Sequence, residues 1–321
     1  MPMLPALIGA AGGLASAVLF YSAVRGSVGL SILLFLLTPL PSLITGFGWG
    51  LTAAVSGAVV GALLMASAVG QNFGIGYFLA LGLPIIIVTH LATLVRYDGD
   101  RIAAWYPEGG ILAAILLYGG ALPILVTPLF GGSYQVLETD FVRFLDRIAE
   151  QAPPDSAWRM PDEQKQHLAK LWIDVMPAAL AAYWTLFFAI NVYLAARISR
   201  ASGSLPRSDF AVSRIELPVL LAPAFLLATF AVTFSGEARI IGASFIGALF
   251  VGFLIMGFTV AHVIGQTRAR WVTPAAYATA IFAGGIALPV LAGIGLGETA
   301  FRFRDRMMPP SDAPTGEPPN A

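Results

Sequence analysis

Long apolar runs without charges constrain this chain more than any other feature of its sequence. A helix of about 20 apolar residues crosses a bilayer core about 30 Å thick, and nine runs of suitable length and composition are present. They cover residues 4–23, 28–45, 49–69, 73–95, 109–130, 174–197, 214–234, 239–265 and 271–296. Because hydrocarbon offers the backbone no hydrogen-bond partner, each run should be a helix. The sequence therefore predicts an all-α, polytopic membrane bundle of about nine transmembrane helices.

The overall composition supports a membrane location. A soluble globular chain carries roughly 25% charged residues, whereas 11% of these 321 residues are charged and 57% are hydrophobic. The formal net charge is zero, so the chain lacks the basic surface that attracts nucleic acid. We expect the lipid bilayer to be the main partner and nucleic acid not to be one.

The sequence offers few residues for catalysis or metal binding. It contains no cysteine, which excludes disulfides, thiolate metal ligands and cysteine nucleophiles. The three histidines, His90, His167 and His262, lie far apart and lack metal-ligand spacing. Nucleophile elbows, phosphate-binding loops and dinucleotide fingerprints are also missing from the sequence. We expect a protein that is not an enzyme and that holds neither a cofactor nor a metal.

The first apolar run is expected to be a membrane span rather than a signal peptide. Ala15-Ser16-Ala17 has the form of a cleavage site, but no basic residue precedes the run and the run continues beyond this site.

Arginines in the connecting segments predict the orientation of the spans. With the N-terminus inside, three inner segments hold eight arginines, at positions 96, 101, 197, 200, 207, 214, 268 and 270. The short outer segments hold Arg25 and Arg239. We therefore expect a multi-pass membrane protein with its N-terminus inside and residues 131–173 outside. Nine spans would place Arg302, Arg304 and Arg306 outside, whereas eight spans with one re-entrant run would place them inside, and the sequence leaves both counts open.

The long connecting segment 131–173 has an amphipathic pattern. Apolar residues recur at helical spacing at Leu137, Phe141, Phe144, Leu145 and Ile148. The pattern predicts a helix that lies on the membrane surface or caps the bundle. Pro161-Asp162-Glu163 is typical of the start of a second helix, which is expected to run into the sixth span with a kink at Pro177. The alternative is a solvated connector without an ordering role.

Two prolines interrupt the second span. Pro39 and Pro41 lack N–H groups, so the carbonyls of Phe35 and Leu37 lose their helical donors well inside the apolar run. Transporters use such broken helices to bind substrates near the middle of the membrane. Neighbouring helices, or the hydroxyls of Thr38 and Ser42, would instead satisfy the carbonyls and leave a simple kink. Both interpretations stay open, and Pro39 and Pro41 are candidate ligand-binding positions.

Small residues recur four apart in the first span. The pairs Ala6/Ala10 and Gly9/Gly13 allow another helix to approach closely. This face is expected either to pack inside the protein or to dock a membrane protein partner or a second copy of the chain.

Several polar and aromatic residues are candidates for binding a small molecule. Tyr21, Arg25, Tyr183 and Trp184 are expected near the outer face, where they would line a pocket, although aromatic belts at membrane interfaces give the same pattern. Asn191 is an intramembrane polar residue, and such residues are costly to bury unless they have a role. His90, Glu216 and His262 are further polar residues of this kind, and solvation at the interface is the alternative explanation for all four.

Several short motifs in order resemble one protein family. Pro39-Leu40-Pro41, Gly48-Trp49-Gly50, the segment Arg214-Ile215-Glu216-Leu217-Pro218 and the ending "GETAFRFRDR" resemble the YybS-like bacterial membrane proteins, which contain a domain of unknown function. The N-terminal half of that family is similar to the substrate-binding S components of energy-coupling factor vitamin transporters. The resemblance implies that small residues of the first helix, such as Ala6, Ala10 and Gly13, dock a coupling subunit. Three further spans and Glu298, where the family would have aspartate, depart from the pattern.

These observations predict two membrane units and a tail. Residues 1–197 would form a six-helix, S-component-like unit, residues 198–300 a three-helix unit, and residues 301–321 a polar, disordered tail. The leading hypothesis is a protein that binds or helps to move a small molecule. The alternative is a membrane scaffold or assembly factor that acts through protein–protein contacts.

Overall fold

The computed structural model of this chain describes residues 3–25, 28–98, 101–131, 134–153, 156, 159–205, 207 and 215–306. The expected tail therefore lies outside the described residues from position 307 onward. The main helices of the first half are α1 (Met3–Arg25), α2 (Val28–Leu37), α3 (Leu40–Trp49), α4 (Leu51–Ala68), α5 (Gln71–Tyr77), α6 (Leu83–Thr93) and α7 (Glu108–Val126). The second half has α8 (Tyr134–Gln151), α9 (Asp162–Ala201), α10 (Leu221–Ala231), α11 (Glu237–Thr267), α12 (Val272–Phe282) and α13 (Gly284–Phe301). Short helical turns cover η1 (Phe78–Gly82), η2 (Thr127–Phe130) and η4 (Phe303–Arg306).

The predicted helical membrane bundle is confirmed. Within the described residues, eight helical segments are long and apolar enough to cross a bilayer, as a multi-pass membrane protein requires. They are Met3–Arg25, Leu30–Trp49, Leu51–Ala68, Gln71–Thr93, Glu108–Leu129, Asp162–Ala201, Glu237–Thr267 and Gly284–Phe301.

Two of the nine expected spans differ from their predicted form. The run expected at 214–234 is helical only over the 11 residues of α10, because proline is tolerated only in the first turn of a helix and both Pro218 and Pro223 lie near its start. The run expected at 271–296 is divided at Ala283 into α12 and α13. Gly284 and Gly285 follow that division, and glycine is a weak helix former.

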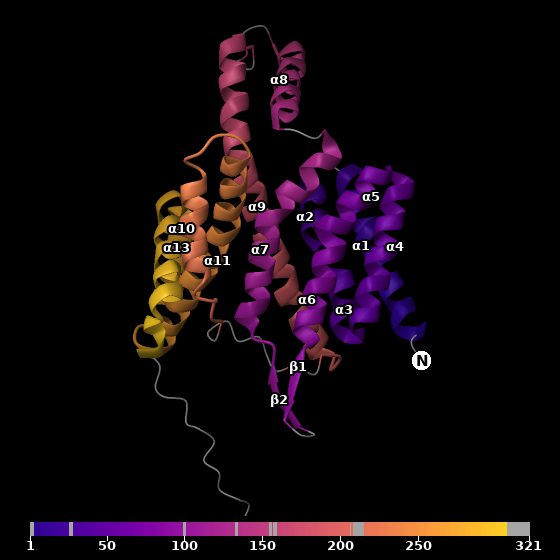
Figure 1. Cartoon of the computed structure of the whole chain (residues 1–321), viewed down its shortest axis with the longest axis vertical. Helices are drawn as coiled ribbons and strands as arrows, with labels where there is room; N and C mark the ends of the chain where they lie inside the picture. Colours follow the sequence, from indigo (N-terminus) through magenta and orange to yellow (C-terminus); the bar gives the residue numbers. More distant parts are fainter. Residues whose placement is uncertain are drawn as a thin grey trace, which may run out of the picture.

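The bundle has a central wall with helices on both sides. In Figure 1, α7 and α9 lie in the middle, α1 to α6 lie on one side, and α10, α11 and α13 lie on the other. One core cluster, which includes Leu43, Ile85 and Phe188, joins the first group of helices to α7 and α9. A second cluster, which includes Leu116 and Phe253, joins α7 to the later helices. Because α7 contributes to both clusters, a division into units 1–197 and 198–300 stays a prediction.

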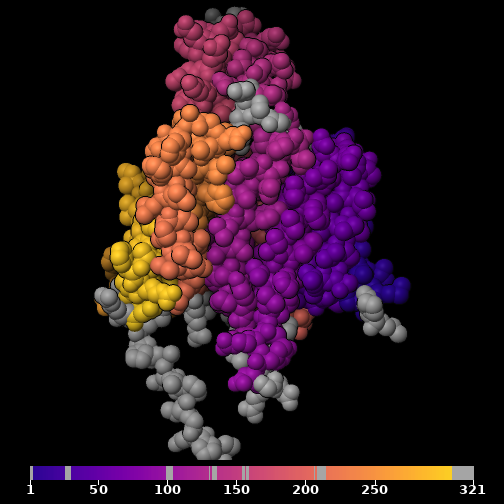
Figure 2. All heavy atoms as spheres, in the orientation of Figure 1, coloured from indigo at the N-terminus to yellow at the C-terminus, as the bar shows by residue number. Residues whose placement is uncertain are grey.

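The expected amphipathic helix is present as α8, and it packs against the start of α9. It stands beside the first turns of α9 and projects past the other helices, and the two form a separate lobe in the space-filling view (Figures 1 and 2). Phe141 stacks on Trp172 with ring centroids 4.5 Å apart, and Lys165 Nζ donates to Asp146 Oδ1 at 2.6 Å. Phe141 of the apolar stripe therefore packs on α9 and Leu145 is buried, whereas Phe144 is 49% exposed. The predicted start of α9 after Pro161 and its passage through Pro177 are confirmed.

A two-stranded antiparallel hairpin lies at the opposite end of the molecule and was not predicted. It consists of β1 (Val95–Asp98) and β2 (Arg101–Trp105), with Val95 opposite Trp105. We call this end of the bundle the β end and the other the α8 end (Figure 1). Under the predicted orientation the β end faces the inside of the cell.

Candidate functional site

The carbonyl groups at the break between α2 and α3 accept hydrogen bonds from other groups of the protein. Thr38 donates its backbone N–H to the Phe35 carbonyl at 3.2 Å and its hydroxyl to the Leu34 carbonyl at 3.0 Å. The Asn191 amide of α9 donates to the Leu36 carbonyl at 2.7 Å and to the Phe187 carbonyl at 2.9 Å. At Phe35 and Leu36 these contacts favour the kink over a ligand-facing break, because buried carbonyls are satisfied by neighbours. Asn191 therefore joins α9 to the proline-interrupted span.

A second proline interruption is closed in the same way. At η1 the helix widens by one residue, so that the Leu83 N–H donates to the Phe78 carbonyl. Pro84 has no N–H to offer the Ala80 carbonyl, and the indole of Trp184 donates to that carbonyl at 2.9 Å. The Tyr118 hydroxyl donates to the Leu79 carbonyl at 2.6 Å. The predicted binding residue Trp184 thus satisfies the backbone of the neighbouring helix.

The four residues expected at an outer pocket make contacts with other groups of the protein. Arg25 is placed over the ring of Tyr21, 5.2 Å from its centroid. Tyr183 stacks on Phe35 and Phe187, with ring centroids 6.3 Å and 6.0 Å apart. Trp184, the next residue along α9, instead contacts η1. Aromatic rings therefore fill the space between α2 and α9 near Tyr183.

The small residues of α1 pack inside the protein. A Cβ on Gly9 would overlap the Ala53 backbone of α4, and a Cβ on Gly13 would overlap Gly57. At Ala6, the carbonyl accepts a hydrogen bond from the Ser56 hydroxyl at 2.9 Å, and Ala10 is half-buried beside these contacts. Close approach to α4 therefore accounts for the small residues in this face.

A cavity of about 300 Å³ lies between the central wall and the later helices. Residues from α7, α9, α11 and α12 line it, together with one residue of the segment before α10. The lining consists of Glu108, Ile111, Leu112, Ile115, Leu186, Ala189, Ile190, Val192, Tyr193, Ile215, Ile255, Phe258 and Tyr277. Its size and apolar walls are typical of a small-molecule site between the helices of a bundle.

Glu108 places the one carboxylate of this lining at the β end. It is the first residue of α7, and its Oε1 accepts a hydrogen bond from Arg207 Nη2 at 2.8 Å. The same nitrogen donates to the Tyr106 carbonyl at 2.6 Å. The Arg207 side chain is 1% exposed and that of Glu108 is 23% exposed. Glu108 is thus held by a buried cation while part of its carboxylate stays accessible.

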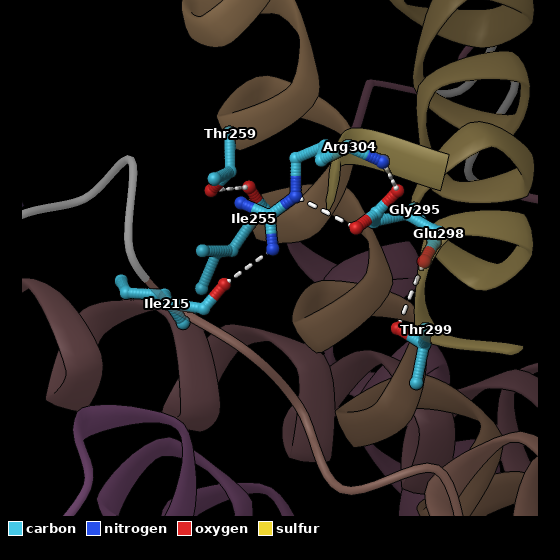
Figure 3. A network of polar contacts seen from close by, with 7 residues as sticks. All are labelled: Ile215, Ile255, Thr259, Gly295, Glu298, Thr299 and Arg304. Atoms are coloured by element: carbon cyan, nitrogen blue, oxygen red, sulfur yellow. Dashed lines mark hydrogen bonds and ion pairs between the residues drawn. The ribbon is translucent and has the colours of Figure 1, made fainter. Parts of the chain in front are cut away.

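A second buried ion pair lies at the C-terminal end of α13 (Figure 3). Arg302 adopts a left-handed conformation with φ of 47°, which turns the chain back after the helix. Arg304 then donates from Nε to Glu298 Oε1 at 2.8 Å and from its backbone N–H to Oε2 at 3.0 Å. Its Nη2 also donates to the Ile215 carbonyl at 2.7 Å. Because the backbone of Glu216 lies against Gly109 at the start of α7, this pair lies at the β end.

Two of the remaining polar residues are also accounted for by local contacts. The ring of His262 contacts Tyr277 edge-on, and its Nδ1 lies 2.9 Å from the Phe258 carbonyl. Glu216 is exposed at the β end. Within the described ranges, no group of three His, Asp or Glu side chains is arranged to hold a metal ion.

The residues that build the cavity mouth were not singled out from the sequence. Glu108 lies at the edge of an apolar run, where a charge is usually a solvated helix end, and Arg207 lies in a connecting segment. The only local signal was the pattern Pro107-Glu108, which is typical of a helix start. Comparison with models of known protein families, with characterised proteins and with solved structures finds no match to this chain.

Proposed function

We propose that this chain is an inner-membrane protein of bacteria that binds an amphiphilic small molecule in the cavity between α7, α9, α11 and α12. The observation that carries the proposal is the cavity itself, which has long apolar walls and a single carboxylate at one end. Ligand sites commonly combine such walls with a few polar groups that fix orientation.

Exposed residues at the cavity edge indicate entry from the bilayer. The side chains of Leu186, Ile190, Tyr193 and Tyr277 line the cavity and are between 39% and 49% exposed. In an embedded bundle, apolar side chains of membrane helices that are exposed at this depth face hydrocarbon. A ligand with an apolar chain would therefore pass between α9 and α12 without entering water.

A cavity-filling variant tests this proposal. Ala189→Trp would place an indole inside the cavity, whereas Ala179→Trp would add the same ring to an exposed position of α9 outside it. Mass spectrometry of small molecules that co-purify in mild detergent should show at least a tenfold loss of the bound amphiphile in Ala189→Trp and no loss in Ala179→Trp. Equal retention by the two variants would contradict the proposal.

The lobe formed by α8 and the start of α9 favours a second candidate function, that of a membrane scaffold. Phe144, Leu168 and Leu171 lie on this lobe and are between 41% and 49% exposed, although the lobe projects beyond the bundle (Figure 2). Large contiguous patches of exposed apolar side chains mark contacts with proteins or membranes, and a scaffold would use these residues in that way. If the scaffold function is correct, Leu168→Glu combined with Leu171→Glu should dissociate a larger complex on native gels while leaving the unfolding temperature unchanged.

A further inference from the structure

We infer that the amphiphile bound in the cavity has a head group that donates a hydrogen bond, a hydroxyl or a protonated amine, and that Glu108 accepts it. This inference rests on the proposed function and names the ligand class for the same site. It follows from which atoms of the ion pair the cavity can reach.

The acceptor side of the ion pair faces the cavity. Glu108 is one of the lining residues and Arg207 is not, and the guanidinium is almost fully buried behind the carboxylate. Arg207 contacts Oε1, whereas Oε2 accepts no hydrogen bond from the part of the chain that the structure describes. An ionised carboxylate has about four acceptor positions and no donor. The head group that complements it must therefore be a donor.

The surroundings of Glu108 favour a negative charge at this point. The positive end of the α7 dipole and the buried guanidinium both stabilise an anion there. A carboxylate or phosphate head would meet Glu108 before it could reach Arg207, and like charges repel. An anionic amphiphile is therefore the class that this cavity should bind least well.

The rest of the lining fixes the direction in which the apolar chain of a bound ligand would lie. Ile111, Leu112 and Ile115 continue from Glu108 along α7, and seven residues of helix extend roughly 10 Å. With its head at Glu108, a ligand would lie along this apolar wall and point toward the α8 end. Apart from Glu108, the lining residues with polar side-chain atoms are the two tyrosines, Tyr193 and Tyr277.

Four probes with the same chain length test the inference on the full-length protein in mild detergent. Dodecanol, dodecylamine, laurate and dodecane differ only in the head group, and their dissociation constants can be compared by displacement of a bound fluorescent alkyl probe. We expect dodecanol and dodecylamine to bind at least tenfold more tightly than laurate and dodecane, which corresponds to about 1.4 kcal/mol. Comparison of the alcohol with the amine shows which donor is preferred.

The variant Glu108→Gln assigns the preference to this side chain. An amide both donates and accepts, so the ratio of laurate to dodecanol dissociation constants should fall at least fivefold. Because both probes are measured on the same sample, this ratio does not depend on the fraction of protein that folds. If Glu108→Gln does not fold, the comparison of the four probes on the unaltered chain decides alone.

Different results would overturn the inference about the head group and the proposed function. Four probes that bind equally tightly, or laurate that binds best, would overturn the inference while leaving an amphiphile site. If no probe binds, or if Ala189→Trp binds all of them as well as the unaltered chain does, the cavity is not a ligand site and both are overturned.

Discussion

Single residues at the β end carry charges that the fold buries completely. Glu298 and Arg304 have side chains that are 2% and 3% exposed, and they satisfy each other through two hydrogen bonds to the carboxylate. Taking two charges out of water is costly, and the contact offsets that cost only when the geometry is good. The pair therefore matters most when one partner is removed.

At this scale we predict that Glu298→Ala destabilises the protein by about 3–5 kcal/mol, because the buried guanidinium of Arg304 would lose the carboxylate that balances its charge. The measurement is the unfolding temperature of the purified protein in detergent. Asp305→Asn is the matched control, since Asp305 is exposed on the same turn and surface changes usually fall within about 0.5 kcal/mol. Similar unfolding temperatures for the two variants would show that the ion pair contributes little.

At the scale of elements, α9 donates hydrogen bonds to two other spans at the points where prolines interrupt them. Trp184 donates to the carbonyl that Pro84 leaves without a helical donor, and Asn191 donates to the Leu36 carbonyl at the break near Pro39. The two side chains are seven residues apart, which is about two turns of helix. One helix therefore supplies hydrogen bonds to both interrupted spans, which supports a structural role for residues that the sequence offered as ligand contacts.

A double-mutant cycle tests the role of Asn191. Asn191→Leu should destabilise the protein by about 1–3 kcal/mol, because it leaves a buried carbonyl without a donor. In a chain that also carries Pro39→Ala and Pro41→Ala, a continuous helix would bring the Leu40 N–H to the Leu36 carbonyl, and most of that cost should disappear. The measurement is chemical or thermal unfolding of the four proteins. If Asn191→Leu destabilises the protein equally with and without the proline substitutions, Asn191 does not stabilise the break.

The lobe formed by α8 and α9 gives a second prediction for an element. Phe141→Ala removes the ring that stacks on Trp172, so α8 should detach from α9 and become at least tenfold more sensitive to limited proteolysis. Glu150→Ala is the matched control, because this side chain is exposed on the same helix. The unfolding temperature of the bundle should be the same in both, since the lobe lies outside it. Equal protease sensitivity of the two variants would contradict this packing.

At the scale of the whole molecule, the position of the C-terminal arginines bears on the number of membrane crossings. Arg304 contacts Ile215 at the β end, next to the start of α7. The described chain therefore ends at the β end after α13. The C-terminal arginines then lie on the same side as Arg207, which removes the conflict that nine crossings create.

Cysteine labelling tests this arrangement, because the chain contains no cysteine of its own. A membrane-impermeant thiol reagent should label Glu150→Cys in intact cells, and should label Asp98→Cys and Asp305→Cys only after lysis. Labelling of Asp305→Cys in intact cells, with Asp98→Cys still protected, would indicate nine crossings. Labelling of Glu150→Cys only after lysis would reverse the whole orientation.

The sequence by itself determined the features that depend on neighbouring residues. Apolar runs predicted the membrane helices, the spacing of Phe141 and Leu145 predicted an amphipathic helix, and Pro39 and Pro41 located the break, because each property acts within a few turns. The same local reasoning missed how far Pro218 and Pro223 delay α10, since it located the apolar run rather than the start of the helix.

Only the tertiary structure decided which groups meet. Asn191 is 155 residues from the carbonyl that it satisfies, and Arg207 is 99 residues from Glu108. In a bundle of uniformly apolar helices, many pairings bury the same hydrophobic surface, so composition does not choose among them. Close approach at glycines and the need to satisfy buried polar groups depend on three-dimensional contacts. The cavity and its carboxylate are consequences of that choice, and no local pattern in the chain encodes them.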